Sequence, residues 1–125
     1  MNGKIVKFTD LDVWMEGHQW VLVVYKTTKN FPRDEIFALT SQMRRCSVSI
    51  TSNIAEGFSS NSQKERIQFY SIALGSVTEH QNQLLIARDV GYTSKIEFTV
   101  VAEQSVVTHR ILNGLIKKTK TFLKS

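Results

Sequence analysis

The fold of this chain is decided by residues 62–91, which read SQKERIQFYSIALGSVTEHQNQLLIARDVG. Ser62 precedes Glu65 by three residues, which is the pattern of a capping box at the start of a helix. Gly91 stands where a glycine commonly ends a helix. Between these ends, apolar side chains recur at three- and four-residue steps on one face: Phe69, Ala73, Val77, Leu84 and Ala87, widened by Tyr70, Leu74 and Leu85. This period predicts an amphipathic helix over residues 62–90.

Two further helices are predicted before this one. The first covers residues 12–29 and ends before Pro32, because proline disfavours the helical conformation in the residue that precedes it. The second covers residues 34–58, and its apolar residues also recur at helical steps: Ile36, Leu39, Met43, Cys46, Ile50 and Ile54. Many of its other positions carry short side chains, mainly Ser and Thr, which lower helix propensity but allow a neighbouring helix to approach closely.

A fourth helix is predicted over residues 94–120, where Ser94 and Glu97 repeat the capping-box pattern. Its predicted apolar stripe consists of Val100, Gln104, Val107, Ile111 and Leu115. One proline and six glycines in 125 residues favour long uninterrupted elements. The chain, residues 1–125, is therefore predicted to be a single domain of the all-α class, folded as an up-and-down antiparallel four-helix bundle.

The longest apolar run of the chain is Trp20–Tyr25. Its composition also suits a strand, as does that of Phe98–Val101, but no turn residues separate either segment from its helical surroundings. Six consecutive helical residues, at about 100° each, point in all directions around the axis, whereas a bundle buries one stripe of each helix. The outer side is therefore expected to be covered by a chain tail or another subunit. The interface candidates are Trp20, Leu22, Val23 and Tyr25.

The chain is basic, with a formal net charge of +5 and an isoelectric point near 9.5. No acidic residue follows Glu103. The candidates for nucleic-acid contact are Arg44, Arg45, Arg110, Lys117, Lys118, Lys120 and Lys124. Phosphate backbones attract such a group of cations. Cations near the end of a helix also complement its macrodipole and keep a protein soluble, and the sequence alone leaves both interpretations open.

Arg44 and Arg45 lie about 100° apart on their predicted helix, so at most one of them points into the bundle. The inward arginine needs a carboxylate partner, and Glu56 and Glu79 are the acidic residues on helices expected to face it. The outward arginine is free to contact a phosphate or a partner protein.

Residues that would support catalysis or metal binding are sparse. The chain has no glycine-rich phosphate-binding motif and no Cys-x-x-Cys pair. Its three histidines do not form the Glu-x-x-His pairs of a di-iron bundle, so no metal or cofactor is expected. Cys46, the single cysteine, lies on an apolar face and is expected to be a core residue rather than a nucleophile. The absence of a signal-peptide pattern and of a membrane-length apolar run predicts a cytoplasmic location.

Several parts of the chain carry a resemblance to a known family: Leu11–Trp14, Tyr25, Phe31–Pro32, Leu39–Arg45, Ser49–Phe58, Phe69–Glu79 and Gln83–Leu84. Together they resemble the bacterial four-helix-bundle family encoded in intervening sequences of large-subunit (23S) ribosomal RNA genes, over about residues 10–92. The resemblance implies a four-helix protomer that assembles into a homopentamer. Its fold is similar to that of the accessory variability determinant of diversity-generating retroelements, a basic pentamer that binds a reverse transcriptase and nucleic acid.

Two functions therefore compete. The charge and the resemblance favour a non-enzymatic, homo-oligomeric scaffold that contacts RNA, DNA or a nucleic-acid enzyme of the reverse-transcriptase kind. The alternative is a purely structural or protein-interaction module, in which the positive charge serves solubility. No enzymatic activity and no membrane partner are expected.

Overall fold

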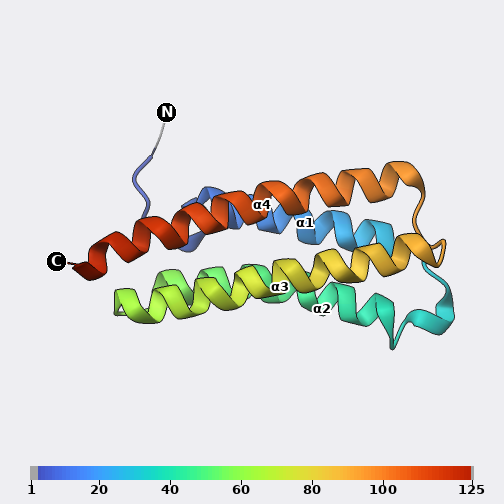
Figure 1. Cartoon of the computed structure of the whole chain (residues 1–125), viewed down its shortest axis with the longest axis horizontal. Coiled ribbons are helices and arrows are strands. Elements are labelled where there is room, and N and C mark those ends of the chain that lie inside the picture. Colours follow the sequence, from blue (N-terminus) through green and yellow to red (C-terminus); the bar gives the residue numbers. More distant parts are fainter. Residues whose placement is uncertain (1–2, 125) are drawn as a thin grey trace.

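The computed structural model describes residues 3–124, and within them the chain forms four α-helices and three short 3-10 turns. The helices are α1 (Asp12–Thr28), α2 (Leu39–Ser59), α3 (Gln63–Asp89) and α4 (Lys95–Thr121), and the 3-10 turns are Phe8–Asp10, Arg33–Glu35 and Phe122–Lys124. The α1–α2 and α3–α4 connections lie at one end of the bundle, and the α2–α3 turn and the carboxyl terminus lie at the other (Figure 1). The predicted all-α, antiparallel four-helix bundle is confirmed.

None of the described residues is in a strand, so the two segments with strand-like composition, Trp20–Tyr25 and Phe98–Val101, are helical as predicted. Among the described residues each helix packs against two neighbours, in the order α1, α2, α3, α4 and back to α1. The space enclosed by this square is filled by fully buried side chains: Trp20, Val24, Met43, Ile50, Ile54, Val77, Leu84, Val101 and Leu112. Burying an aliphatic or aromatic side chain of this size stabilises a fold by roughly 1.5–3 kcal/mol.

The helix starts and ends predicted around residues 62–94 agree with the structure to within a residue. The hydroxyl of Ser62 accepts the Glu65 backbone N–H at 3.1 Å, and Ser94 forms a complete capping box with Glu97. Gly91 has a φ of +84°, the left-handed conformation that glycine adopts without steric cost. These local interactions satisfy backbone groups that a helix end otherwise leaves unpaired.

The predicted start of the second helix is wrong, because α2 begins at Leu39 rather than at residue 34. Glu35 holds the preceding segment in a different conformation: one carboxylate oxygen accepts the Leu39 N–H at 3.2 Å, and the other accepts the Tyr92 hydroxyl at 2.6 Å. Ala38 in between has φ −126° and ψ −112°, outside the helical region. Ile36, predicted to lie on the buried stripe, is consequently 53% exposed.

The predicted stripe of the fourth helix is displaced from the buried face by one residue. Val100 is 47% exposed, whereas the buried residues of α4 are Val101, Ser105, Thr108, Leu112, Ile116 and Thr119. Half of these are polar, but their hydroxyls donate to carbonyls of the same helix; Thr108, for instance, bonds Gln104 O at 3.0 Å. A hydroxyl paired in this way can be buried at little cost, and a count of apolar residues alone misses it.

Small side chains bring α2 and α3 close together. Cys46 Sγ donates to the Ser76 carbonyl oxygen at 3.1 Å, and the hydroxyls of Ser49 and Ser76 lie 3.2 Å apart. Near the end of α2, a Cβ placed on Gly57 would lie 2.6 Å from Cε1 of Tyr70 and 3.1 Å from Cβ of Phe69. Tyr70 is 2% exposed and has no room to move away, so only glycine fits at position 57.

We expect Gly57→Ala to lower the free energy of unfolding by about 1–3 kcal/mol, the typical cost of overpacking a core. The matched control is Gly75→Ala on α3, where an added Cβ meets no atom within 4 Å. That substitution is expected to raise stability by up to about 1 kcal/mol through helix propensity. Urea denaturation followed by circular dichroism measures both, and a Gly57→Ala variant as stable as the wild type would contradict this packing.

Candidate functional site

The predicted basic residues that the structure describes are exposed, except for the half-buried Arg44, and they fall into two separate groups. Arg110, Lys117, Lys118 and Lys120 lie on the second half of α4, whereas Arg44 and Arg45 lie in the second turn of α2 (Figure 1). The 27 residues of α4 span about 40 Å, at 1.5 Å per residue. The side chain of Lys124 lies outside the described part of the structure. The sequence therefore predicted one set of cations where the fold builds two separate surfaces.

Arg44 is half-buried, as predicted for one member of the arginine pair, but its predicted carboxylate partner is wrong. Its Nε donates to Thr28 Oγ1 at 2.8 Å, and its guanidinium carbon lies 4.7 Å from the centroid of the Tyr25 ring. Arg44 faces the end of α1, and its Nη2 reaches the Tyr25 carbonyl oxygen at 3.5 Å, an oxygen that also accepts the Lys29 N–H. Neither Glu56 nor Glu79 contacts it, and Arg45 points to solvent.

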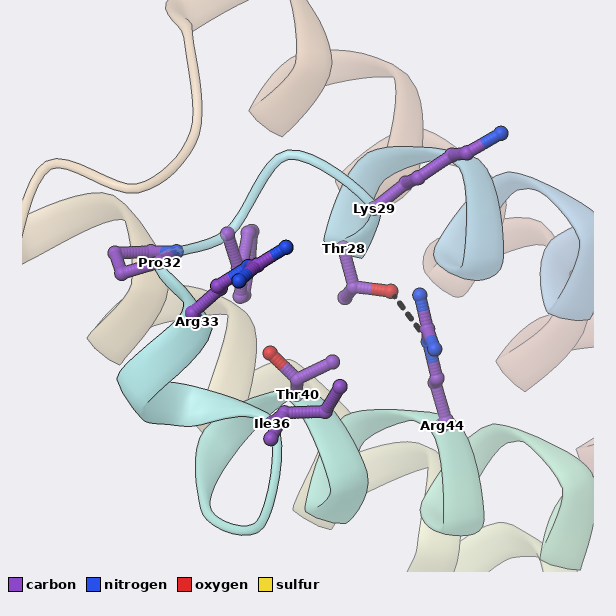
Figure 2. Close-up of a pocket in the computed structure, with 8 residues that line it drawn as sticks. Thr28, Lys29, Pro32, Arg33, Ile36, Thr40 and Arg44 are labelled. Atoms are coloured by element: carbon purple, nitrogen blue, oxygen red, sulfur yellow. Dashed lines mark hydrogen bonds between the residues drawn. The ribbon is translucent and has the colours of Figure 1, made fainter.

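Beside Arg44 the surface forms a hollow of about 280 Å³ (Figure 2). The end of α1, the turn that follows it and the first residues of α2 line it: Thr28, Lys29, Phe31, Pro32, Arg33, Ile36, Thr40 and Arg44. Three of these residues are cations and none is acidic. Lys29, Arg33 and Thr40 were not among the residues predicted from the sequence. Lys29 and Arg33 flank Phe31-Pro32, but Asp34 and Glu35 follow them directly and hide the positive charge of this turn in the sequence.

The interface candidates of α1 differ in their placement. Trp20 is fully buried between the helices, so its inclusion among the interface residues is wrong. The apolar run Trp20–Tyr25 winds around α1, and Trp20 and Val24 lie on the side of the helix that faces the core. Val23 is half-buried against the core. Leu22 and Tyr25 are 50% and 43% exposed, and they remain available on the outer side of the bundle.

Cys46 is a core residue, as predicted. It is 6% exposed, and burial together with the charge of Glu79 raises the pKa of its thiol to about 12. A thiol in this state is not an activated nucleophile. Within residues 3–124 no three His, Cys, Asp or Glu side chains come together as a metal site would need.

His80 is the other chemistry-bearing group inside the bundle. It is fully buried, and its ring packs edge-on against Trp20 with the centroids 4.7 Å apart. No described residue forms a hydrogen bond with either ring nitrogen. Burial lowers the pKa of His80 to about 4, so the ring is neutral at pH 7.

The four packed helices and the net positive charge define this chain as a small basic four-helix-bundle protein. A family model described as 23S rRNA-intervening sequence protein matches residues 9–114, and the chain belongs to this family. The predicted family is thereby confirmed, and the match extends into α4, beyond the residues that carried the resemblance. No curated protein matches the sequence.

The fold has a solved relative. A protein of unknown function from the S23 ribosomal protein family of Bacteroides thetaiotaomicron VPI-5482 superposes with a TM-score of 0.78. The two chains are 21% identical, and the match covers 84% of this chain and 95% of that one. At this identity the likeness shows a shared fold. Across the described residues, no helix combines the length and apolar character that crossing a bilayer requires.

The buried His80 predicts a specific loss of stability in mild acid. In the unfolded chain the ring takes up a proton near pH 6.5, whereas in the folded chain it does so only near pH 4. The unfolded state therefore binds more protons between these values, and the free energy of unfolding falls by up to about 1.4 kcal/mol per pH unit as the pH drops through this window. Above pH 6.5 the contribution disappears.

Denaturant titrations between pH 7.5 and 5 measure this effect as the difference between wild type and His80→Leu. The variant should lack the part of the slope that His80 contributes, and it also removes two buried nitrogens that have no partner in the protein. Thr78→Val, at an exposed and non-ionisable position of α3, serves as the control and should keep the wild-type slope. Identical pH dependence in wild type and His80→Leu would contradict the assignment.

Proposed function

We propose that this protein is a non-enzymatic, self-associating scaffold whose basic surface on α4 contacts nucleic acid or an enzyme that processes it. The supporting observation is the outer side of α4. Arg110 and Lys117 are seven residues apart and so share a face, with Lys120 beside Lys117. All three are exposed, and none forms an ion pair with another described residue. Unpaired cations in a row are the groups that neutralise phosphates.

Two further considerations support the nucleic-acid role. The description of the family associates it with intervening sequences in 23S rRNA. The formal net charge of +5 on 125 residues attracts polyanions over a Debye length of about 8 Å at physiological salt. A reducing cytoplasmic setting belongs to the same proposal, because the single thiol, Cys46, forms no disulfide.

The self-association rests on apolar side chains that the bundle leaves exposed. Met15 and Leu22 of α1 are seven residues apart, so they share a face, and they are 44% and 50% exposed. Tyr25 continues this apolar surface toward the end of α1. A second subunit that covers Leu22 would remove this surface from water, which is the main favourable term in protein association. The family resemblance makes a homopentamer the expected assembly.

Leu22→Glu is expected to dissociate the assembly, because burying an unpaired carboxylate in an apolar contact costs several kcal/mol. Sedimentation equilibrium should give a multiple of the 14.3 kDa chain mass for the wild type and a value near 14.3 kDa for the variant. Thr78→Glu, at an exposed position of α3, adds the same charge and should leave the mass unchanged. A monomeric wild type would refute self-association, and an unaltered mass in Leu22→Glu would refute this face.

Nucleic-acid binding is expected to weaken as salt rises, with a log–log slope of about −0.9 for each duplex phosphate that a cation neutralises. Reversal of Lys117, Lys118 and Lys120 to glutamate should lower the affinity at low salt and reduce the magnitude of the slope. Fluorescence anisotropy with labelled RNA and DNA duplexes, at several salt concentrations, measures both quantities.

The control reverses three exposed lysines outside α4, Lys4, Lys26 and Lys64, and so gives the same net charge. Equal weakening by both triple variants would assign the effect to net charge rather than to α4. A wild-type slope near zero would reject nucleic-acid contact and leave the alternative, a structural or protein-interaction module in which the lysines serve solubility.

A further inference from the structure

The hollow beside Arg44 differs from the other surfaces of the bundle in the polar groups that meet there. It lies where α1 ends and α2 begins, at the opposite end of the bundle from the α4 lysines (Figures 1 and 2). Lys29 and Arg33 come from the turn between the two helices, and Arg44 comes from α2. Its volume of about 280 Å³ is near the lower end of the range for small-molecule sites, about 300–1,000 Å³.

The three cations are not neutralised by the protein. Among the described residues none of them forms an ion pair. Two acidic residues, Asp34 and Glu35, follow Arg33 in the chain, and neither forms an ion pair with it. The carboxylate of Glu35 instead accepts the Tyr92 hydroxyl and the Leu39 N–H. Arg33 and Arg44 lie on either side of Thr40, whereas the Lys29 side chain extends away from it (Figure 2). Unneutralised cations at one hollow favour the binding of an anion there.

A structural role accounts for only one of these cations. Arg44 bonds Thr28 and the Tyr25 carbonyl oxygen, and it thereby completes the end of α1. The side chains of Lys29 and Arg33 have no hydrogen-bond partner among the described residues, so the need to cap α1 does not explain them. The hollow also lies at the amino-terminal end of α2, a helix of 21 residues whose dipole favours negative charge.

Thr40 supplies the observation that separates this hollow from a chance group of cations. It is 5% exposed, and its hydroxyl has no hydrogen-bond partner among the described residues. Figure 2 shows this hydroxyl turned toward the side of the hollow on which Arg33 lies. A buried hydroxyl that forms no hydrogen bond destabilises the fold, unless a bound ligand or water molecule forms one with it.

Three other buried threonines of the bundle are satisfied by their own helices. The hydroxyls of Thr28, Thr108 and Thr119 donate to carbonyls four residues earlier, at 2.7, 3.0 and 2.7 Å. Thr40 is the second residue of α2, so the residue four positions earlier, Ile36, precedes the helix. The hydroxyl is therefore left without a helical acceptor by its place in the fold, and it is turned toward the side of the hollow on which Arg33 lies.

We infer that this hollow is a binding site for a phosphate group. Arg33, Lys29 and Arg44 hold the phosphate, and one of its oxygens accepts a hydrogen bond from the Thr40 hydroxyl. Phosphate matches the site because its oxygens accept from both hydroxyl and guanidinium donors. Phe31, Pro32 and Ile36 line the rest of the hollow with apolar surface, which suits the organic part of a phosphate monoester. The site goes beyond the proposed contact at α4 and does not depend on it.

Inorganic phosphate is the first probe, titrated into the ¹⁵N-labelled full chain at constant ionic strength maintained with sodium chloride. Saturable NMR shifts of the Arg33, Thr40 and Arg44 resonances are expected. Thr40→Val keeps the shape and removes the hydroxyl, and it should weaken binding about tenfold, the value of one hydrogen bond to a charged group. Arg33→Gln should weaken binding by at least as much.

Matched controls separate the site from general charge effects. Thr78→Val and Lys95→Gln alter an exposed threonine and an exposed lysine outside the hollow, and both should bind as the wild type does. The triple reversal on α4 should also retain phosphate binding, so failure of the proposed function and failure of this site are distinguishable. Thr40→Val is expected to fold, because it removes a hydroxyl that has no partner in the protein.

A second titration compares the sources of phosphate. Adenosine 5′-monophosphate that binds more tightly than inorganic phosphate, with no binding of adenosine, assigns the site to small monoesters. Tighter binding of a 5′-phosphorylated oligonucleotide than of its 5′-hydroxyl form assigns it to nucleic-acid ends. Shifts that do not saturate, that match those from chloride, or that are equal in wild type and Thr40→Val would overturn the inference.

Discussion

The close approach of α2 and α3 is the contact on which the rest of the bundle depends. Gly57 admits the Tyr70 ring, and Cys46, Ser49 and Ser76 meet through short side chains at the middle of the interface. α1 and α4 pack against this pair of helices, and large side chains from all four helices fill the space enclosed by the bundle. Trp20 is the largest of them and is fully buried. The small residues of α2 lower its helix propensity, and packing against α3 has to compensate for that loss.

The middle of each helix was largely predictable from the sequence, and the exceptions have a common physical cause. Hydrophobic periodicity identified Met43, Ile50 and Ile54 as core residues, because burial removes the surface of an apolar side chain from water. It failed for α4, where Ser105 and Thr108 are buried because their hydroxyls bond the helix backbone. Such pairing depends on helix geometry rather than on hydropathy, so an apolar stripe displaced by one residue is the expected error.

The ends of the helices were predictable only where the interaction that forms them is local. Ser62 with Glu65 is a contact over three residues, and it fixed the start of α3 correctly. The start of α2 depends instead on Glu35 and Tyr92, which are 57 residues apart in the chain. Sequence patterns around residue 34 carry no information about Tyr92. The same limit applies to the cations, since their grouping at two ends of the bundle follows from topology and not from spacing along the chain.

This difference between helix middles and helix ends bears on where a binding site can arise in such a protein. Within a helix, a threonine hydroxyl can donate to the carbonyl oxygen four residues earlier, as those of Thr28, Thr108 and Thr119 do, and it then needs no other partner. In the first turn that carbonyl is missing or belongs to a loop, and the hydroxyl needs another acceptor. Thr40 occupies such a position, and the turn that follows α1 places Arg33 on the side to which its hydroxyl is turned. A bundle with a packed interior therefore offers its binding chemistry at its ends, where the backbone itself leaves polar groups to be satisfied.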